Sequence, residues 1–117
     1  MSSFDFLKAK SAHLNWRLRI LGLLNGEETL TRDQVVSHKH CDLGKWLYSE
    51  GLDKYKEIPE MIDLEKVHKD LHTSISKVVE LKEKHLIKEA RDEYEKMRET
   101  SEILIQIIDV LVTKLKS

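Results

Sequence analysis

Residues 59–84 read PEMIDLEKVHKDLHTSISKVVELKEK, and this stretch carries the strongest structural signal in the chain. Its apolar side chains and its two histidines recur every three or four residues, which is the repeat of one face of an α-helix. Pro59 suits the first turn, because a backbone N–H at that position would have no helical partner. The pattern predicts a long helix from about Pro59 to Lys84, broken near His85, with one face turned inward: Leu64, His68, Leu71, His72, Ile75, Val78 and Val79.

Helical patterns also cover both flanks of this stretch. On the N-terminal side we expect a first long helix from Phe4 to Leu24, with Asn25-Gly26 as its stop. On the C-terminal side we expect a last helix from roughly Ile87 to Lys116. Its predicted buried face consists of Tyr94, Met97, Leu104, Ile107, Ile108, Leu111 and Leu115.

A short helical piece is expected between the first helix and Pro59. In CDLGKWLY (residues 41–48), three apolar residues share one face at helical spacing: Leu43, Trp46 and Leu47. We expect Gly51 to end this piece, and a helical turn to start upstream at Thr31 or Asp33. The sequence therefore predicts an all-α fold, an antiparallel bundle of three long helices plus one short helical segment bearing the cysteine, similar to a four-helix bundle. No low-complexity linker interrupts the chain, so residues 1–117 are expected to form a single domain.

The first helix has an unusually wide apolar surface. One stripe consists of Phe6, His13, Trp16, Ile20 and Leu24, and a second consists of Leu7, Leu14, Leu18 and Leu21. A helix that packs only against its own bundle needs one such stripe. The second stripe predicts contact with something else, and a second copy of the chain is the partner that we expect.

Composition excludes several classes of protein. The net charge is −1, with 20 basic and 21 acidic residues, so no basic surplus is available for binding nucleic acid. A single cysteine excludes an intrachain disulfide. The N-terminal residues lack a signal-peptide pattern, and no apolar run reaches membrane-spanning length. We therefore expect a cytoplasmic protein that neither binds nucleic acid nor inserts into a membrane.

Three histidines and the cysteine form the candidate site. His68 and His72 are four residues apart on one helix, so both rings project from one face beside Leu71. His13 lies on an inward stripe of the first helix, and Cys41 opens the short helical segment. Three imidazoles and one thiolate form a closed tetrahedral set that is typical of structural or sensory zinc. Such a set leaves no open position for a catalytic water, so we expect no enzymatic activity.

Alternatives remain for these residues. Inward histidines can be core residues of a metal-free helical interaction module, and a histidine-rich helical bundle can also be a hemerythrin-like di-iron protein. His38, His40 and His85 are expected to be exposed, with His40 as the chief rival for a ligand position. Glu65, one turn before His68, is interpreted as a carboxylate that orients an imidazole. Three aromatic residues are expected to fill the core: Trp16, Trp46 and Tyr48.

The motifs HLNWR (residues 13–17) and CDLGKWLY (residues 41–48), followed by His68-x3-His72, resemble the chemoreceptor zinc-binding domain family. The resemblance covers nearly the whole chain, and the Cys-x-Leu-Gly-Lys-Trp block is its specific part. It implies a dimeric helical bundle with zinc held by His13, Cys41, His68 and His72. It also implies a role in bacterial signalling, as a partner of a chemoreceptor or a diguanylate cyclase, and a response to zinc or to oxidants such as hypochlorous acid.

Overall fold

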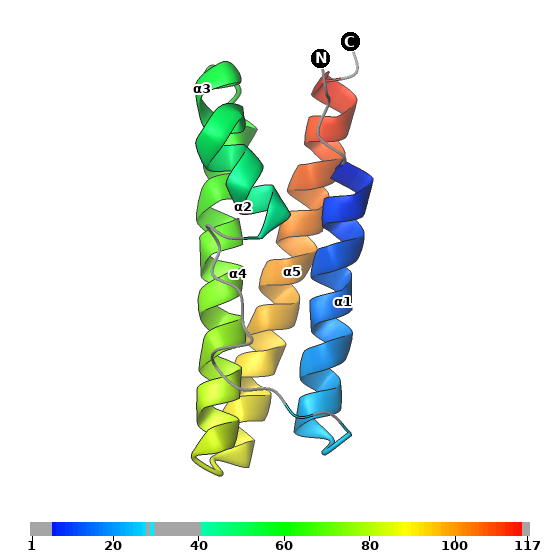
Figure 1. The fold of residues 1–117 in the computed structure, drawn as a ribbon, viewed down its shortest axis with the longest axis vertical. Coiled ribbons are helices and arrows are strands. Elements are labelled where there is room, and N and C mark those ends of the chain that lie inside the picture. Colours follow the sequence, from blue (N-terminus) through cyan, green and yellow to red (C-terminus); the bar gives the residue numbers. More distant parts are fainter. Residues whose placement is uncertain (1–5, 28, 30–40, 116–117) are drawn as a thin grey trace.

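Three long helices form the body of the molecule. The computed structural model describes residues 6–27, 29 and 41–115, in which the long helices are α1 (Phe6–Leu24), α4 (Pro59–Glu83) and α5 (Ile87–Leu115). α4 and α5 form a hairpin, and α1 lies against α5 (Figure 1). The predicted all-α bundle is confirmed for the described residues. The expected helix start at Phe4, the turn at Thr31 or Asp33 and the helix end at Lys116 lie outside them.

Ion pairs between the helices show their relative directions. Lys10 of α1 bonds to Asp109 of α5 at 2.9 Å, and Arg17 bonds to Glu102 at 3.0 Å. A step of seven residues forward on α1 therefore matches a step of seven residues backward on α5, as antiparallel helices require. Each pair is partly exposed and contributes little to stability, so the pairs report the register of helices that are held by their apolar faces.

A smaller helical unit carries the cysteine, and we call residues 41–54 the cysteine arm. It consists of α2 (Asp42–Trp46), a π-helical turn η2 (Leu47–Gly51) and α3 (Leu52–Lys54), which follow one another without interruption. The expected stop at Gly51 is wrong, because Gly51 has right-handed helical dihedral angles (φ −60°, ψ −49°) and the helix continues through it. The arm lies across one end of the bundle, over α4 (Figure 1).

The ends of the long helices follow the local signals in the sequence. Pro59 occupies the first turn of α4, as expected. Gly26, after α1, and His85, after α4, both have positive φ angles (80° and 61°). At His85 the Leu86 N–H donates to the Leu81 carbonyl at 2.9 Å, which satisfies one of the last carbonyls of α4.

The core follows the predicted inward faces closely on α4 and less closely on α5. All seven residues that we expected to face inward on α4 are buried. On α5, four of the expected residues are buried (Met97, Leu104, Ile108 and Leu111), whereas Tyr94, Ile107 and Leu115 are only half-buried. Glu93 and Ser101 are buried instead. α5 packs against both α1 and α4. Its most buried residues therefore include polar side chains, which a search for apolar residues at helical spacing does not select.

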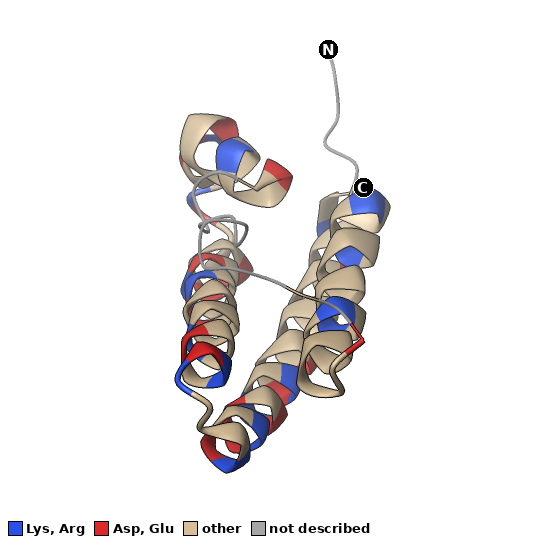
Figure 2. Cartoon of the chain, turned by 60° about the horizontal axis from the view of Figure 1, so that its bottom comes forward, with Lys and Arg blue, Asp and Glu red and all other residues tan. Residues whose placement is uncertain are grey.

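Charged residues of both signs are intermixed on the outer faces of α4 and α5 (Figure 2). α1 carries only basic charges, of which Lys10 and Arg17 are paired with α5. None of the described helices has the length and apolar content needed to cross a membrane.

Candidate metal centre

His13 reaches the centre of the bundle from α1. Its side chain is only 3% exposed, and its Nδ1 atom lies 2.7 Å from the carbonyl oxygen of Ala9, one turn earlier. A carbonyl oxygen only accepts hydrogen bonds, so Nδ1 carries the ring hydrogen and Nε2 keeps its lone pair. A backbone carbonyl that orients the ring and selects its tautomer is the usual support for a histidine that binds a metal.

Burial also keeps His13 in its neutral form. Loss of solvent lowers the pKa of His13 below its ordinary value of 6.5, and the hydrogen bond to Ala9 offsets part of this shift. A charged imidazolium has no lone pair to donate, so a lowered pKa leaves the ring available as a ligand at neutral pH.

Cys41 enters the site from the first position of the cysteine arm. It is the N-cap of α2, with an extended backbone (φ −76°, ψ 162°), and its Sγ atom accepts a hydrogen bond from the N–H of Gly44 at 3.4 Å. The same Sγ lies 3.0 Å from Nε2 of His68. The sulfur therefore takes the place that a serine or aspartate oxygen has in other helix caps.

Without a metal ion, Cys41 is held as a thiol. Burial raises the pKa of Cys41, the N–H groups of Gly44 and Leu43 lower it, and the negative charge of Asp42 raises it. A divalent cation beside the sulfur reverses this balance, because a thiol that binds a metal is deprotonated. The donors of the α2 N-terminus then point at a thiolate, which they stabilise.

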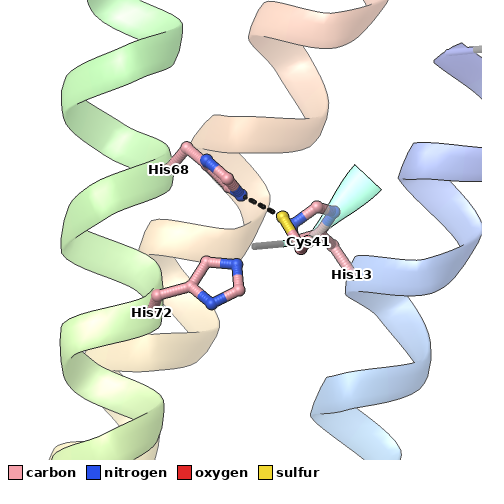
Figure 3. A group of neighbouring side chains, drawn as sticks. All are labelled: His13, Cys41, His68 and His72. Atoms are coloured by element: carbon pink, nitrogen blue, oxygen red, sulfur yellow. Dashed lines mark hydrogen bonds between the residues drawn. The ribbon is translucent and has the colours of Figure 1, made fainter. Parts of the chain in front are cut away.

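His68 and His72 complete the group from α4. Both rings are buried (0% and 3% exposed), and their centroids are 4.6 Å apart. The ring of His13 lies 5.0 Å from that of His68 and 5.7 Å from that of His72. Figure 3 shows the three rings and the Cys41 sulfur converging on one point between α1 and α4.

The four side chains fit a zinc ion. Their ligating atoms all lie within 4.8 Å of one another. A tetrahedral zinc ion with nitrogen and sulfur donors separates neighbouring ligand atoms by about 3.5 Å, so small side-chain movements bring this group to the required geometry. Borderline-soft nitrogen and sulfur donors favour zinc over magnesium or calcium, which take oxygen ligands. Four protein ligands also complete the tetrahedron.

The remaining predicted residues lie at the edge of the site or away from it. We expect Glu65 to orient an imidazole; in the structure its carboxylate contacts the hydroxyl of Tyr48. Partial burial and this carboxylate raise the pKa of Tyr48 to about 12. Tyr48 is 42% exposed, so its expected place in the core is wrong. His85 is exposed, as expected, whereas His38 and His40 lie outside the described residues.

Two supports of the site were not predicted from the sequence. One is the Ala9 carbonyl, for which the sequence has no signal, because every helical residue has a carbonyl. The other is the capping of α2 by Cys41. Its signal is positional: a cysteine directly before a short helical pattern stands where serine, threonine or aspartate usually stands.

Comparison with known proteins identifies the family. Residues 13–79, more than half of the chain, match the family described as chemoreceptor zinc-binding domain. The match begins at His13 and includes Cys41, His68 and His72, and it ends before α5. No curated protein and no solved structure matches the chain. The family match and the converging histidine and cysteine side chains agree, and the chain belongs to the chemoreceptor zinc-binding domain family.

Proposed function

We propose that this protein is a regulatory module, and not an enzyme, that senses zinc, an oxidant such as hypochlorous acid, or both, in bacterial signalling through chemotaxis or cyclic-di-GMP control. Its zinc ligands are His13, Cys41, His68 and His72. One observation carries the proposal: donors from three separate elements, α1, the cysteine arm and α4, converge within 4.8 Å. A site built from distant segments couples the presence of the ion to the arrangement of those segments.

The arm is the segment whose placement depends most on the site. When bound, zinc supplies a positive charge that holds the Cys41 thiolate. His68 and His72 belong to one long helix, and His13 belongs to another that is paired with α5. Among the contacts of the arm with the bundle are those of Cys41 with His68, Tyr48 with Glu65, and Trp46 with Phe6. We infer that loss of the sulfur ligand moves the arm and leaves the long helices in place.

An oxidant acts on the same sulfur. Hypochlorous acid transfers oxygen to a thiolate, so that sulfur loses two electrons, a sulfenic acid forms and chloride leaves. Cys41 is partly exposed, so an oxidant of this size reaches it. The sulfenic acid is a poor ligand, and the remaining three imidazoles hold zinc less tightly.

The ligand set is tested by metal replacement. Protein purified without a histidine tag is expected to contain one zinc ion per chain. Replacement by Co²⁺ is expected to give a near-ultraviolet thiolate-to-cobalt absorption band that Cys41→Ser abolishes. His85→Ala, which removes an exposed histidine at the end of α4, is the matched control and should change neither zinc content nor the band. A band that survives in Cys41→Ser contradicts the proposed ligand set.

The oxidant response needs a separate experiment. Zinc-loaded protein is titrated with hypochlorous acid while a chromogenic chelator reports released zinc and circular dichroism reports helix content. We expect zinc release before any loss of helicity. Release that only accompanies unfolding counts against oxidant sensing and leaves zinc sensing as the function.

Two other functions predict different results. A hemerythrin-like di-iron centre needs bridging carboxylates, and the cluster found among the described residues contains none. Such a centre also absorbs visible light, which a zinc protein does not. A metal-free interaction module would be purified without stoichiometric metal, so the zinc analysis separates it from the proposed function.

The protein is also proposed to act as a homodimer that contacts a signalling partner, either a chemoreceptor or a diguanylate cyclase. The second apolar stripe of α1 supports a dimer. Its four leucines are exposed in one chain, with Leu7 and Leu18 at 69% and Leu14 and Leu21 at 37%. Their spacing of seven, four and three residues is that of a coiled-coil seam. We propose that α1 meets α1 of a second copy along this stripe.

A further inference from the structure

Gly51 lies under the indole ring of Trp46, five residues earlier in the cysteine arm. A Cβ atom at position 51 would be 2.8 Å from Cζ3, 2.9 Å from Cη2 and 3.0 Å from Cε3 of Trp46. Real Cβ atoms do not approach other atoms so closely. All three contacts are with one rigid ring, so a single atom added at Gly51 forces the whole ring to move.

The π-helical turn produces this contact. In an α-helix, residues five apart are about 140° apart around the axis, and their side chains do not meet. Between Leu47 and Leu52 the chain instead makes an i to i+5 hydrogen bond, from the Leu52 N–H to the Leu47 carbonyl. This widened turn brings position 51 beneath position 46. Turns of this kind occur often at functional sites.

The Trp46 ring is confined on its other sides. It is 9% exposed, and Phe6 of α1 meets it edge-on with the ring centroids 5.2 Å apart. The ring of Tyr55, just after α3, lies 6.2 Å away. A ring held between α1 and the end of the arm fixes the arm relative to the bundle, and displacement of the ring displaces the arm.

Cys41 is at the other end of the same rigid helical piece. The Lys45 N–H donates to the Cys41 carbonyl at 2.8 Å, and the Gly44 N–H donates to its sulfur. α2 therefore connects Trp46 to Cys41 without a flexible link. We propose that Gly51 is a positioning residue for the metal site: the absence of a side chain at this position seats Trp46, and Trp46 places the Cys41 sulfur against His68. This inference rests on the proposed ligand set.

Gly51→Ala tests the inference, because two effects predict opposite results. Gly51 has helical dihedral angles, so alanine should stabilise the arm if only helix propensity matters. If the ring contact dominates, the Cys41 sulfur moves away from the cluster. We expect Gly51→Ala to keep its helix content, to lose zinc affinity by about tenfold or more, and to show a weakened thiolate-to-cobalt band. Unchanged affinity with an unchanged band overturns the inference.

Two further variants separate the ring contact from general damage to the arm. Glu50→Ala places the same residue in the same π-helical turn, where Glu50 is exposed and only loosely paired with Lys54 at 3.9 Å. Glu50→Ala should keep the zinc affinity and the thiolate-to-cobalt band of the parent protein. If Glu50→Ala loses as much zinc affinity as Gly51→Ala, Gly51 has no specific role. In a Trp46→Phe background the outer indole atoms are absent, so the effect of Gly51→Ala should be much smaller.

The effect of Gly51→Ala with and without Trp46→Phe either supports or contradicts the ring contact. If Gly51→Ala does not fold while the double variant with Trp46→Phe folds, the ring contact is supported. If alanine at position 51 has the same effect in both backgrounds, or neither folds, the inference is wrong. A Co²⁺-substituted parent protein without a thiolate band contradicts the proposed ligand set itself. A parent band that persists in Gly51→Ala contradicts only this inference.

Discussion

Ser101 is a polar residue in the middle of the most buried line of α5. It is 0% exposed, between Met97 and Leu104 in the same inward line, and its hydroxyl oxygen has no hydrogen-bond partner within the described part of the chain. A buried hydroxyl without a partner costs free energy that an apolar side chain would not.

Ser101→Ala is therefore expected to raise the free energy of unfolding of the zinc-free protein by about 1 kcal/mol, measured by urea denaturation. Ser76→Ala is the matched control, because Ser76 is an exposed serine within α4. It reports the gain in helix propensity alone, a few tenths of a kcal/mol by order of magnitude. Loss of stability in Ser101→Ala would show that the hydroxyl has a structural role.

His13 makes stability depend on pH in the zinc-free protein. Its pKa is lowered by burial, so between that lowered pKa and 6.5 the unfolded state binds more protons than the folded state. Stability therefore rises with pH in this window. Above pH 6.5 the neutral His13 ring makes its full contribution to the free energy of unfolding. This contribution is lost as the pH falls from 6.5 towards the lower pKa of the folded state.

We expect the free energy of unfolding to decrease as the pH is lowered from 8 to 5, and to decrease less steeply in His13→Gln. Urea denaturation of zinc-free protein at a series of pH values measures both slopes. His85→Gln is the control, since His85 is exposed, and it should follow the parent protein. Equal slopes in His13→Gln and the parent would show that His13 does not titrate with folding.

At the scale of an element, Cys41 serves the cysteine arm in two ways. It caps α2 through its sulfur and offers the same sulfur to the metal. Serine is one of the best N-cap residues, whereas alanine cannot cap a helix. The two substitutions therefore separate the roles.

In zinc-free protein, Cys41→Ala should lower the free energy of unfolding by about 1 kcal/mol relative to Cys41→Ser, because only serine replaces the capping contact. Zinc affinity, measured by competition with a chelator, should fall in both variants. Equal stability of the two zinc-free variants would show that the cap contributes nothing, and a serine variant with parental zinc affinity would exclude the sulfur as a ligand.

At the scale of the whole molecule, the exposed leucine stripe of α1 predicts a dimer. Lys10 and Arg17, two of the cations of α1, are each paired with an α5 carboxylate. These two positive charges are therefore already paired when two copies of α1 meet. Exposed leucines at heptad spacing are costly in a monomer and favourable in a helix pair.

Leu18→Glu should convert the dimer to a monomer in light-scattering measurements, since it places a negative charge at one of the two most exposed positions of the seam. Leu86→Glu is the control: Leu86 is an exposed leucine, at 42%, that lies between α4 and α5 and is not part of the stripe. A parent protein that is monomeric at all concentrations would contradict the proposed interface, as would a Leu86→Glu variant that dissociates equally.

Local spacing was sufficient to predict the long helices, the inward face of α4 and the pairing of His68 with His72, because helix ends and helix faces depend on residues within a few positions of one another. Pro59, Gly26 and the His68–His72 pair all act over that range. The zinc-specific motif around Cys41 is local for the same reason. These features are therefore determined by the sequence without reference to how the helices pack.

The tertiary structure alone decided the features that depend on neighbours distant in sequence. Ser101 is buried on α5, the helix that packs against both α1 and α4, and Tyr48 is exposed although its position in the sequence suggested the core. The sequence pattern predicts that Gly51 ends a helix, but the helix continues through it. The indole ring of Trp46, packed against position 51, is the reason that no side chain fits there. The same holds for the site: spacing placed two histidines together, but only the packing of three helical segments brings His13 and Cys41 within reach of them.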